Sequence, residues 1–399
     1  MVPTIEIDST RAWVAAVAAS TANGMAFGTA YTFGTFFDSM ADEFGAQRGS
    51  TALLFGITLL FFFGFGVVAG PLSDRFGRHR LFVVGATLFV VGLWLTARVS
   101  SIEVGYVTYG VGVGIGSGCF VAPLTAQVGQ LFVRHRGLAL GVVATGNGVG
   151  TLVLSPLSES LIASGGWRSG YRVLAVVAAV IFLAALPAVR GRPAAPDTAS
   201  SGLAPTGFLR TPAFASLFTS GTLMSVGLFV AFAFVVPFAT DEGVSSAGAS
   251  RLVAVIGLAS IVGRLGLTSI TDRLGSVAVY RAALAIQPVA FVVWLIAGGN
   301  YPLLVLFAVV LGVSYGGFVA VAPALLIDVF GTEDLGRKMG AVFCGFGIGG
   351  LIGPTLAGSV ADATSGRSAP IVLVLVILVV ALATTSPLRR AATAPAPVR

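Results

Sequence analysis

Residues 252–271 read LVAVIGLASIVGRLGLTSIT and decide the fold, since about 20 apolar residues suffice for one helix to cross a bilayer. Arg264 is the only charged residue in this stretch. A charge held within a membrane span is costly and by default marks an ion or substrate pathway. Arginine stays protonated, and its fork of donors matches a carboxylate. The stretch therefore predicts a membrane protein that handles a small anion.

The composition of the whole chain excludes a soluble globular protein. Hydrophobic residues make up 56% of the 399 residues and charged residues only 10%, whereas soluble domains carry about 25% charged residues. The cysteines, Cys119 and Cys344, lie in apolar stretches, and the histidines, His79 and His135, lie in basic loops. Neither pair has metal-ligand spacing. We therefore expect no metal, no cofactor and no enzyme activity.

The apolar segments predict an all-α integral membrane protein. The first segment is too long for a signal-peptide core and is interpreted as a retained helix. Twelve segments are long enough to span a bilayer. The predicted spans are 12–37, 50–71, 80–98, 102–130, 137–163, 169–189, 212–239, 249–271, 277–298, 302–329, 338–361 and 369–386.

The distribution of Lys and Arg predicts the orientation of these spans. With both termini in the cytoplasm, the inner segments hold sixteen of the 23 basic residues and the outer loops hold six, which follows the positive-inside rule. We expect a multi-pass protein of the plasma (inner) membrane. The net charge of +7 needs no nucleic-acid partner, because the anionic inner face of the bilayer accounts for it. We expect a monomer in the lipid bilayer.

An internal repeat divides the chain into two halves. Asp74-Arg75-Phe76-Gly77 recurs 198 residues later as Asp272-Arg273-Leu274-Gly275. Two prolines, Pro123 and Pro156, recur at offsets of 200 and 198. Two parallel six-helix repeats around a central cavity are a transporter architecture. The predicted parts are an N-terminal half at 1–189, a cytoplasmic linker at 190–211, a C-terminal half at 212–386 and a disordered tail at 387–399.

The loop after the second span carries a specific motif. Residues 70–80 read GPLSDRFGRHR, which resembles the signature loop of the major facilitator superfamily. We expect Gly70 to allow close helix approach, Gly77 to form a tight turn, and the carboxylate of Asp74 to pair with an arginine or cap a helix. The resemblance implies a gating network on the cytoplasmic side, although the arginines also fit the positive-inside rule alone. The candidate gating residues are Gly70, Asp74, Arg75, Gly77, Arg78, Asp272 and Arg273.

Two further stretches narrow the resemblance. Residues 131–150, LFVRHRGLALGVVATGNGVG, and 31–48, YTFGTFFDSMADEFGAQR, resemble the monocarboxylate transporter and oxalate–formate antiporter branch. In that branch an arginine on the eighth helix is implied to bind the substrate carboxylate, and Arg264 falls at the matching place. Arg264 also lies eight residues, or about 12 Å, before Asp272. This distance predicts a position near the bilayer midplane.

Departures from the branch suggest a substrate with one negative charge. Oxalate-type exchangers are implied to use a lysine in the eleventh helix, whereas the only lysine here is Lys338, at the edge of that helix. Ser260 stands where animal-type monocarboxylate carriers are implied to have an aspartate, so their proton-coupling scheme does not carry over. Phe120, three residues before Pro123, replaces a tyrosine that is often present there in the branch.

Other candidate residues are polar or aromatic groups on the helices that line a central path in this fold. The polar ones also fit interhelical hydrogen bonding, and the phenylalanines also fit core packing. The candidate substrate-binding residues are Arg264, Asn23, Tyr31, Phe120, Asn147, Tyr315, Phe318, Phe343 and Phe346. The candidate proton-carrying residues, all near helix ends, are Asp38, Glu159 and Asp328.

The predicted function is secondary active transport of a small organic monoanion, in particular a monocarboxylate, by alternating access. A proton is the expected coupling ion and would enter with the substrate. A carboxylate bound to Arg264 neutralises the arginine, so that the loaded carrier reorients without a buried net charge. The alternatives are a drug or metabolite exporter of the same superfamily working by proton antiport, and a carboxylate exchanger. The exporter is disfavoured because the fifth span has only Ser155-Pro156 where such exporters resemble one another in a Gly-Pro-x-x-Gly-Gly-like motif.

Overall fold

The computed structural model describes residues 4–190, 192–193, 206–331, 335–364 and 368–388. Nearly all of these residues are helical. The first half of the chain contains β1 (Thr4–Ile5), α1 (Thr10–Tyr31), α2 (Phe33–Phe44), α3 (Arg48–Phe76), α4 (Arg78–Thr96), α5 (Ile102–Gly105), the π-helix η1 (Tyr106–Val113), α6 (Gly114–Leu131) and α7 (Arg136–Val189).

The second half contains the same number of long crossings. Its elements are β2 (Arg192–Pro193), the 3-10 helix η2 (Thr206–Arg210), α8 (Pro212–Asp241), α9 (Ser246–Ser269), α10 (Thr271–Leu274), α11 (Ser276–Ala297), α12 (Tyr301–Phe330), α13 (Leu335–Thr364) and α14 (Ser368–Ala383). The predicted linker at 190–211 and tail at 387–399 fall partly outside the described residues.

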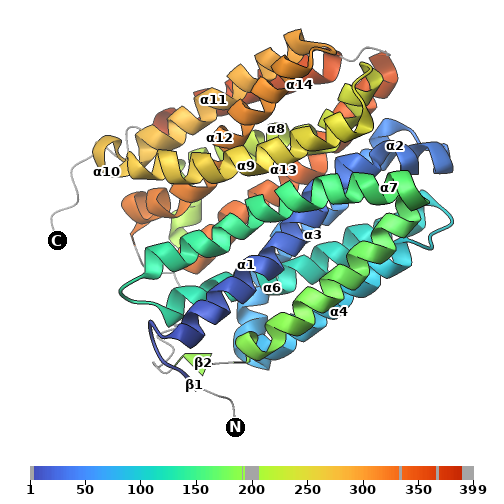
Figure 1. The fold of residues 1–399 in the computed structure, drawn as a ribbon. Helices are drawn as coiled ribbons and strands as arrows, with labels where there is room; N and C mark the ends of the chain where they lie inside the picture. The colour runs from blue at the N-terminus through green and yellow to red at the C-terminus, as the bar shows by residue number, and fades with distance from the viewer. Residues whose placement is uncertain (1–3, 191, 194–205, 332–334, 365–367, 389–399) are drawn as a thin grey trace.

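Twelve membrane crossings account for the long helices. By length and composition, ten helices of the described ranges are able to cross a membrane. One of them, α7, bends at Gly166 (φ 74°, ψ 166°) and contains two crossings, which Figure 1 shows as two green helices meeting at the bend. The twelfth crossing is α1, whose 22 residues span about 33 Å. The prediction of an all-α membrane fold with twelve spans is therefore confirmed.

Local geometry differs from the predicted spans in three places. The first span, expected over 12–37, breaks at Thr32 (φ −84°, ψ 2°), between α1 and α2. The hydroxyl of Thr32 donates to the carbonyl of Thr29, a local bond that competes with the helical pattern. The fourth span passes through the π-helix η1. A parallel pair of two-residue strands, β1 and β2, was not predicted.

The two halves repeat one another in detail. The turns at Gly77 (φ 87°, ψ 137°) and Gly275 (φ 80°, ψ 150°) share a backbone conformation that side chains rarely adopt. After the first turn, Arg78 Nη2 donates to Gln130 Oε1 at 2.9 Å. After the second turn, Ser276 Oγ donates to Asp328 Oδ2 at 2.5 Å. Both partners are shifted by 198 residues, so the predicted two-fold repeat is present in side-chain contacts as well as in helix order.

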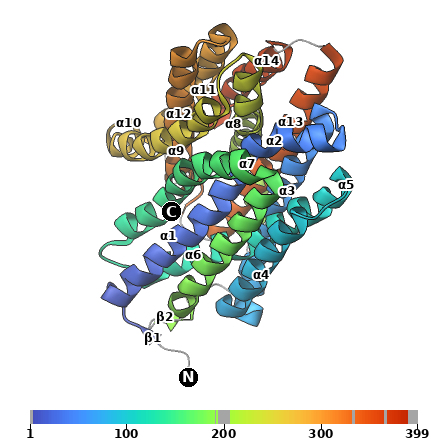
Figure 2. The same ribbon diagram turned by 45° about the vertical axis from the view of Figure 1, so that its right-hand side comes forward.

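The halves lie against each other along two pairs of helices. Figures 1 and 2 show the first half, blue to green, on one side of the second half, yellow to red. Helix α3 packs on α13, and α7 packs on α9. Where α7 crosses α9, a Cβ on Gly148 or on Gly257 would lie 2.8 Å from the carbonyl oxygen of the other. Glycine at both positions therefore lets the two halves meet closely.

Candidate functional site

Arg264 lies on α9 at the contact between the two halves. The side chain is buried, with only 6% of the residue exposed. Its Nη1 donates to the carbonyl of Ala144 on α7, in the other half. Its Cζ lies 5.6 Å from the ring centroid of Tyr315 on α12, within the range of a cation–π contact. One arginine therefore contacts two helices, one from each half.

The height of this site within the molecule follows from the position of Tyr315. Tyr315 is the fifteenth of the 30 residues of α12, so it lies at the middle of that helix. Arg264 itself lies closer to the end of α9, five residues before Ser269. The guanidinium group therefore reaches back towards the level of mid-α12, which agrees with the predicted depth near the bilayer midplane.

Tyr31 closes the site from the first half. Its hydroxyl lies 3.2 Å from the hydroxyl of Tyr315, and its ring stacks on Phe232 of α8 with a centroid distance of 4.1 Å. Tyr31 is 1% exposed. The structure thus brings together three predicted candidates, Arg264, Tyr31 and Tyr315, although they are up to 284 residues apart in the chain.

Aromatic rings continue from Tyr31 as a wall between the halves. Phe27 lies 5.5 Å from Tyr31 and 6.2 Å from Phe63 of α3. Phe63 in turn contacts Phe343 and Phe346 of α13, with centroid distances of 6.0 and 5.9 Å. Two of the predicted phenylalanines, Phe343 and Phe346, therefore face the opposite half. Such rings present an apolar surface to the carbon tail of an organic anion.

The remaining predicted phenylalanines lie within single halves. Phe318 contacts Tyr280 and Phe346, with ring centroid distances of 5.2 and 5.3 Å, so it packs against the aromatic wall from within the second half. Phe120 is fully buried and packs edge-on against Phe82 and Phe182 of its own half. These contacts give Phe120 a packing role.

The two predicted asparagines lie near the crossing of α1 and α7. Asn23 Nδ2 donates to Thr125 Oγ1 at 3.3 Å, and a Cβ on the adjacent Gly24 would lie 2.8 Å from the carbonyl of Gly146 on α7. The side-chain oxygens of Asn23 and Asn147 are buried and accept no hydrogen bond from any residue that the structure describes. Buried acceptors of this kind are costly unless a ligand or water satisfies them.

Only some residues of the predicted gating loop have the expected conformation or contacts. Gly77 forms the expected turn, and Arg78 binds Gln130. Asp74 is exposed and has no ion pair or hydrogen bond within the described ranges, which differs from the expected pairing or capping. The expected close approach of another helix at Gly70 is not seen, because no atom of the described residues lies within 4 Å of a Cβ placed there.

The second copy of the motif, at Asp272 and Arg273, makes no described contact between the halves. Arg273 is exposed, as is Arg75 in the first copy, whose Cζ lies over the ring of the adjacent Phe76. The side chain of Asp272 lies outside the described part of the chain. In this conformation neither copy forms a described ion pair between the halves, so the contacts that join the halves lie elsewhere.

The three candidate proton carriers have different surroundings. Asp38 accepts from Thr240 Oγ1 at 3.3 Å, across the contact between the halves. Asp328 accepts from Ser276 and corresponds in the repeat to Gln130, which does not titrate, so its bond serves as a structural link. Glu159 is half-buried on α7. Geometry therefore favours Asp38 among the three.

Sequence analysis did not identify three phenylalanines at the contact between the halves. Phe27, Phe63 and Phe232 line the contact between the halves, yet each is one of 29 phenylalanines. A weak signal existed for Phe232, because α8 is apolar all round, which is typical of a helix buried on every side. Which phenylalanine faces the other half depends on helix rotation, which local sequence does not specify.

Comparison with known proteins agrees with this architecture. The family model of the Major Facilitator Superfamily matches residues 19–287 and 233–398. The chain is 29% identical to human (Homo sapiens) monocarboxylate transporter 11 over 381 residues, covering 90% of this chain and 79% of that protein. It is 28% identical to monocarboxylate transporter 4 of Rattus norvegicus, covering 82% of this chain and 72% of the relative.

Solved structures share the fold at low sequence identity. The nucleoside transporter NupG superposes with a TM-score of 0.75 at 13% identity, covering 95% of this chain and 100% of that one. A bacterial homologue of the human lysosomal transporter Spinster superposes with a TM-score of 0.74 at 15% identity, covering 98% and 100%. These similarities support the arrangement of helices and leave the substrate to be argued from the site.

Proposed function

The chain belongs to the Major Facilitator Superfamily, and we propose that it carries a small organic monoanion, in particular a monocarboxylate, across the membrane by alternating access. Family membership makes the chain a transporter rather than an enzyme. The relatives named monocarboxylate transporters cover most of its length, which supports the substrate class. The observation that carries the proposal is the buried Arg264 between the two halves.

A guanidinium group at this place suits a carboxylate. Arg264 contacts Ala144 of one half and Tyr315 of the other, so an anion bound there touches both halves. In a buried site a charge-assisted bond is stronger than a neutral one. The aromatic wall that continues from Tyr31 receives an apolar tail. One ligand thus engages both halves, as alternating access requires.

The number of buried cations argues for a single negative charge on the substrate. Lys338, the only lysine in the chain, donates from Nζ to the carbonyls of Phe330 and Gly331, at 2.6 and 3.3 Å. It therefore caps the end of α12 and is engaged there. A second carboxylate on the substrate would lie among apolar rings, where an uncompensated charge costs several kcal/mol.

The proposal also includes the orientation of the protein in the membrane and the coupling ion. We call the end of the molecule with the Gly77 and Gly275 turns the Gly77 end, and the opposite end, which holds Arg48, the Arg48 end. The Gly77 end and both termini face the cytoplasm, and the Arg48 end faces outward. The basic residues of the loops after these turns support this orientation. A proton moves with the substrate, since the loaded carrier then reorients without additional net charge.

Uptake into proteoliposomes tests the substrate class. Purified protein is expected to take up labelled acetate, lactate or benzoate at least about tenfold faster than oxalate or succinate, because one arginine neutralises one carboxylate. Acid outside the vesicles is expected to increase the rate. Equal uptake of mono- and dicarboxylates contradicts the charge argument, and no uptake of any carboxylate favours the exporter.

A further inference from the structure

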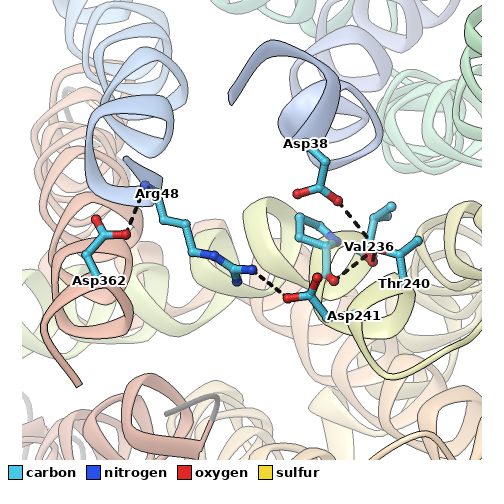
Figure 3. Close-up of polar contacts among 7 residues, drawn as sticks. Asp38, Arg48, Val236, Thr240, Asp241 and Asp362 are labelled. Atoms are coloured by element: carbon cyan, nitrogen blue, oxygen red, sulfur yellow. Dashed lines mark hydrogen bonds and ion pairs between the residues drawn. The ribbon is translucent and has the colours of Figure 1, made fainter. Parts of the chain in front are cut away.

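A cluster of polar side chains joins the two halves at the Arg48 end. Arg48, the first residue of α3, binds Asp241 at the end of α8, with Nη2 and Oδ2 2.5 Å apart. Asp362 of α13 accepts from the backbone N–H groups of Arg48 and Gly49 at 3.1 and 2.9 Å. Asp38 of α2 faces the same place and accepts from Thr240 of α8 (Figure 3). We call these residues (Asp38, Arg48, Gly49, Thr240, Asp241 and Asp362) the outer clasp.

The ion pair of Arg48, the helix cap formed by Asp362 and the contact of Thr240 with Asp38 all cross between the halves. The hydroxyl of Thr240 also lies 3.1 and 2.9 Å from the carbonyls of Val236 and Pro237 on its own helix. Asp362 caps the free N–H groups at the start of α3, where a carboxylate also interacts favourably with the helix dipole. The bond of Arg48 to Asp241 and that of Thr240 to Asp38 lie beside it (Figure 3). The structure therefore has this end closed, and opening it breaks all of these contacts together.

The repeat supplies an ion pair for comparison within one half. Glu43, which lies 198 residues before Asp241, binds Arg168 of α7 at 2.5 Å and also accepts from Trp167 Nε1. Both partners belong to the first half. The same position in the repeat thus stabilises one half through Glu43 and joins the two halves through Asp241.

The strength of the clasp suits a contact that breaks in every cycle. The side chains of Arg48 and Asp241 are 36% and 28% exposed, and an ion pair so exposed is weak because water and salt screen it. One helix cap is likewise a modest contribution. The clasp therefore closes the Arg48 end without locking it.

The charges of the clasp are unbalanced. Three carboxylates, Asp38, Asp241 and Asp362, lie around one arginine. Burial, and after it the negative charge of Asp241, raises the pKa of Asp38, while Arg48 and the bond from Thr240 lower it less. The other charged group that acts on Asp38 is Asp42, on its own helix.

We propose that the outer clasp is a pH-sensitive switch in which Asp38 takes up a proton as the Arg48 end closes. The role of this switch in transport rests on the proposed function, since it links closure of the outward-facing end to the proton concentration outside. When the end opens, water reaches Asp38 and Asp241 moves away from it. The proton is then released to the outside, so the switch links closure of this end to the outside pH and carries no proton across the membrane by itself.

The sign of the pH effect follows from linkage. Closure raises the proton affinity of Asp38 above that of an ordinary aspartate, so the closed state binds more protons than the open state. Acid therefore favours closure, and this preference is lost once the pH rises past the raised pKa. Between the two pKa values, one linked proton changes the ratio of closed to open molecules by up to about tenfold per pH unit.

A distance measurement without substrate tests the switch. Nitroxide labels are placed on the full chain at the exposed outer positions Ser100→Cys and Ser246→Cys, with Cys119 and Cys344 replaced by alanine. Pulsed electron resonance then gives the distance distribution between about pH 8 and about pH 5. The short-distance population is expected to grow as the pH falls, and Asp38→Asn is expected to hold it at every pH.

Glu43→Gln serves as the matched control, because it removes a neighbouring carboxylate that lies outside the clasp. This variant is expected to keep the pH response of the wild type. A wild-type distribution that does not change with pH overturns the proposal, as does an Asp38→Asn variant that responds like the wild type. Because no substrate is present, these outcomes are independent of whether monocarboxylates are the cargo.

Discussion

Arg264→Gln is expected to reduce monocarboxylate uptake at least about 100-fold while the protein still folds and reaches the membrane. Removing one partner of a buried charge pair costs about 3–5 kcal/mol, and each 1.4 kcal/mol is tenfold. Glutamine keeps a donor for the carbonyl of Ala144 but loses the charge that attracts the carboxylate. Initial uptake rates in proteoliposomes, normalised to the amount of reconstituted protein, measure the effect.

Arg251→Gln provides the control on the same helix. Arg251 lies on α9 but is exposed, so its replacement removes an equal charge without entering the site. We expect uptake within about twofold of the wild type, since single surface substitutions change free energies by about 0.5 kcal/mol or less. If Arg264→Gln transports within about tenfold of the wild type, Arg264 does not bind the substrate.

Gly150→Val is expected to destabilise the folded first half. A Cβ on Gly150 would lie 1.9 Å from the carbonyl oxygen of Gly24, so α1 and α7 must move apart by more than 1 Å to admit it. Overpacking of a close contact costs about 1–3 kcal/mol or more. We expect a fall in the thermal unfolding midpoint of about 5 °C or more, measured by loss of monodisperse protein on size-exclusion chromatography after heating.

Gly141→Val tests the same chemical change on the same helix. No atom of the described part of the chain lies within 4 Å of a Cβ placed on Gly141, so valine there meets no described neighbour. This variant is expected to match the wild-type midpoint within about 1 °C. Equal destabilisation by both variants would show that valine disturbs α7 itself, and that the contact with α1 is not the cause.

The sequence by itself determined the class, the helices and the arginine within an apolar span. Hydrophobic length and charge bias are local properties, so twelve spans were recognisable from single segments. The recurrence of the motif at Asp272 predicted the repeat. Arg264 stood out because a charge in an apolar span is rare enough to need a function.

Tertiary structure decided what surrounds each of these residues. Asp74 and Asp241 are both carboxylates near helix ends in the sequence, yet Asp74 is exposed without a described bond and Asp241 joins the halves through Arg48. The two carboxylates have different surroundings because the Arg48 end is closed. Which end is closed depends on how the two halves, about 200 residues apart in the chain, pack together. Local sequence fixes neither helix rotation nor that packing, so the outer clasp and the ring of Phe232 beside Tyr31 became visible only in the fold.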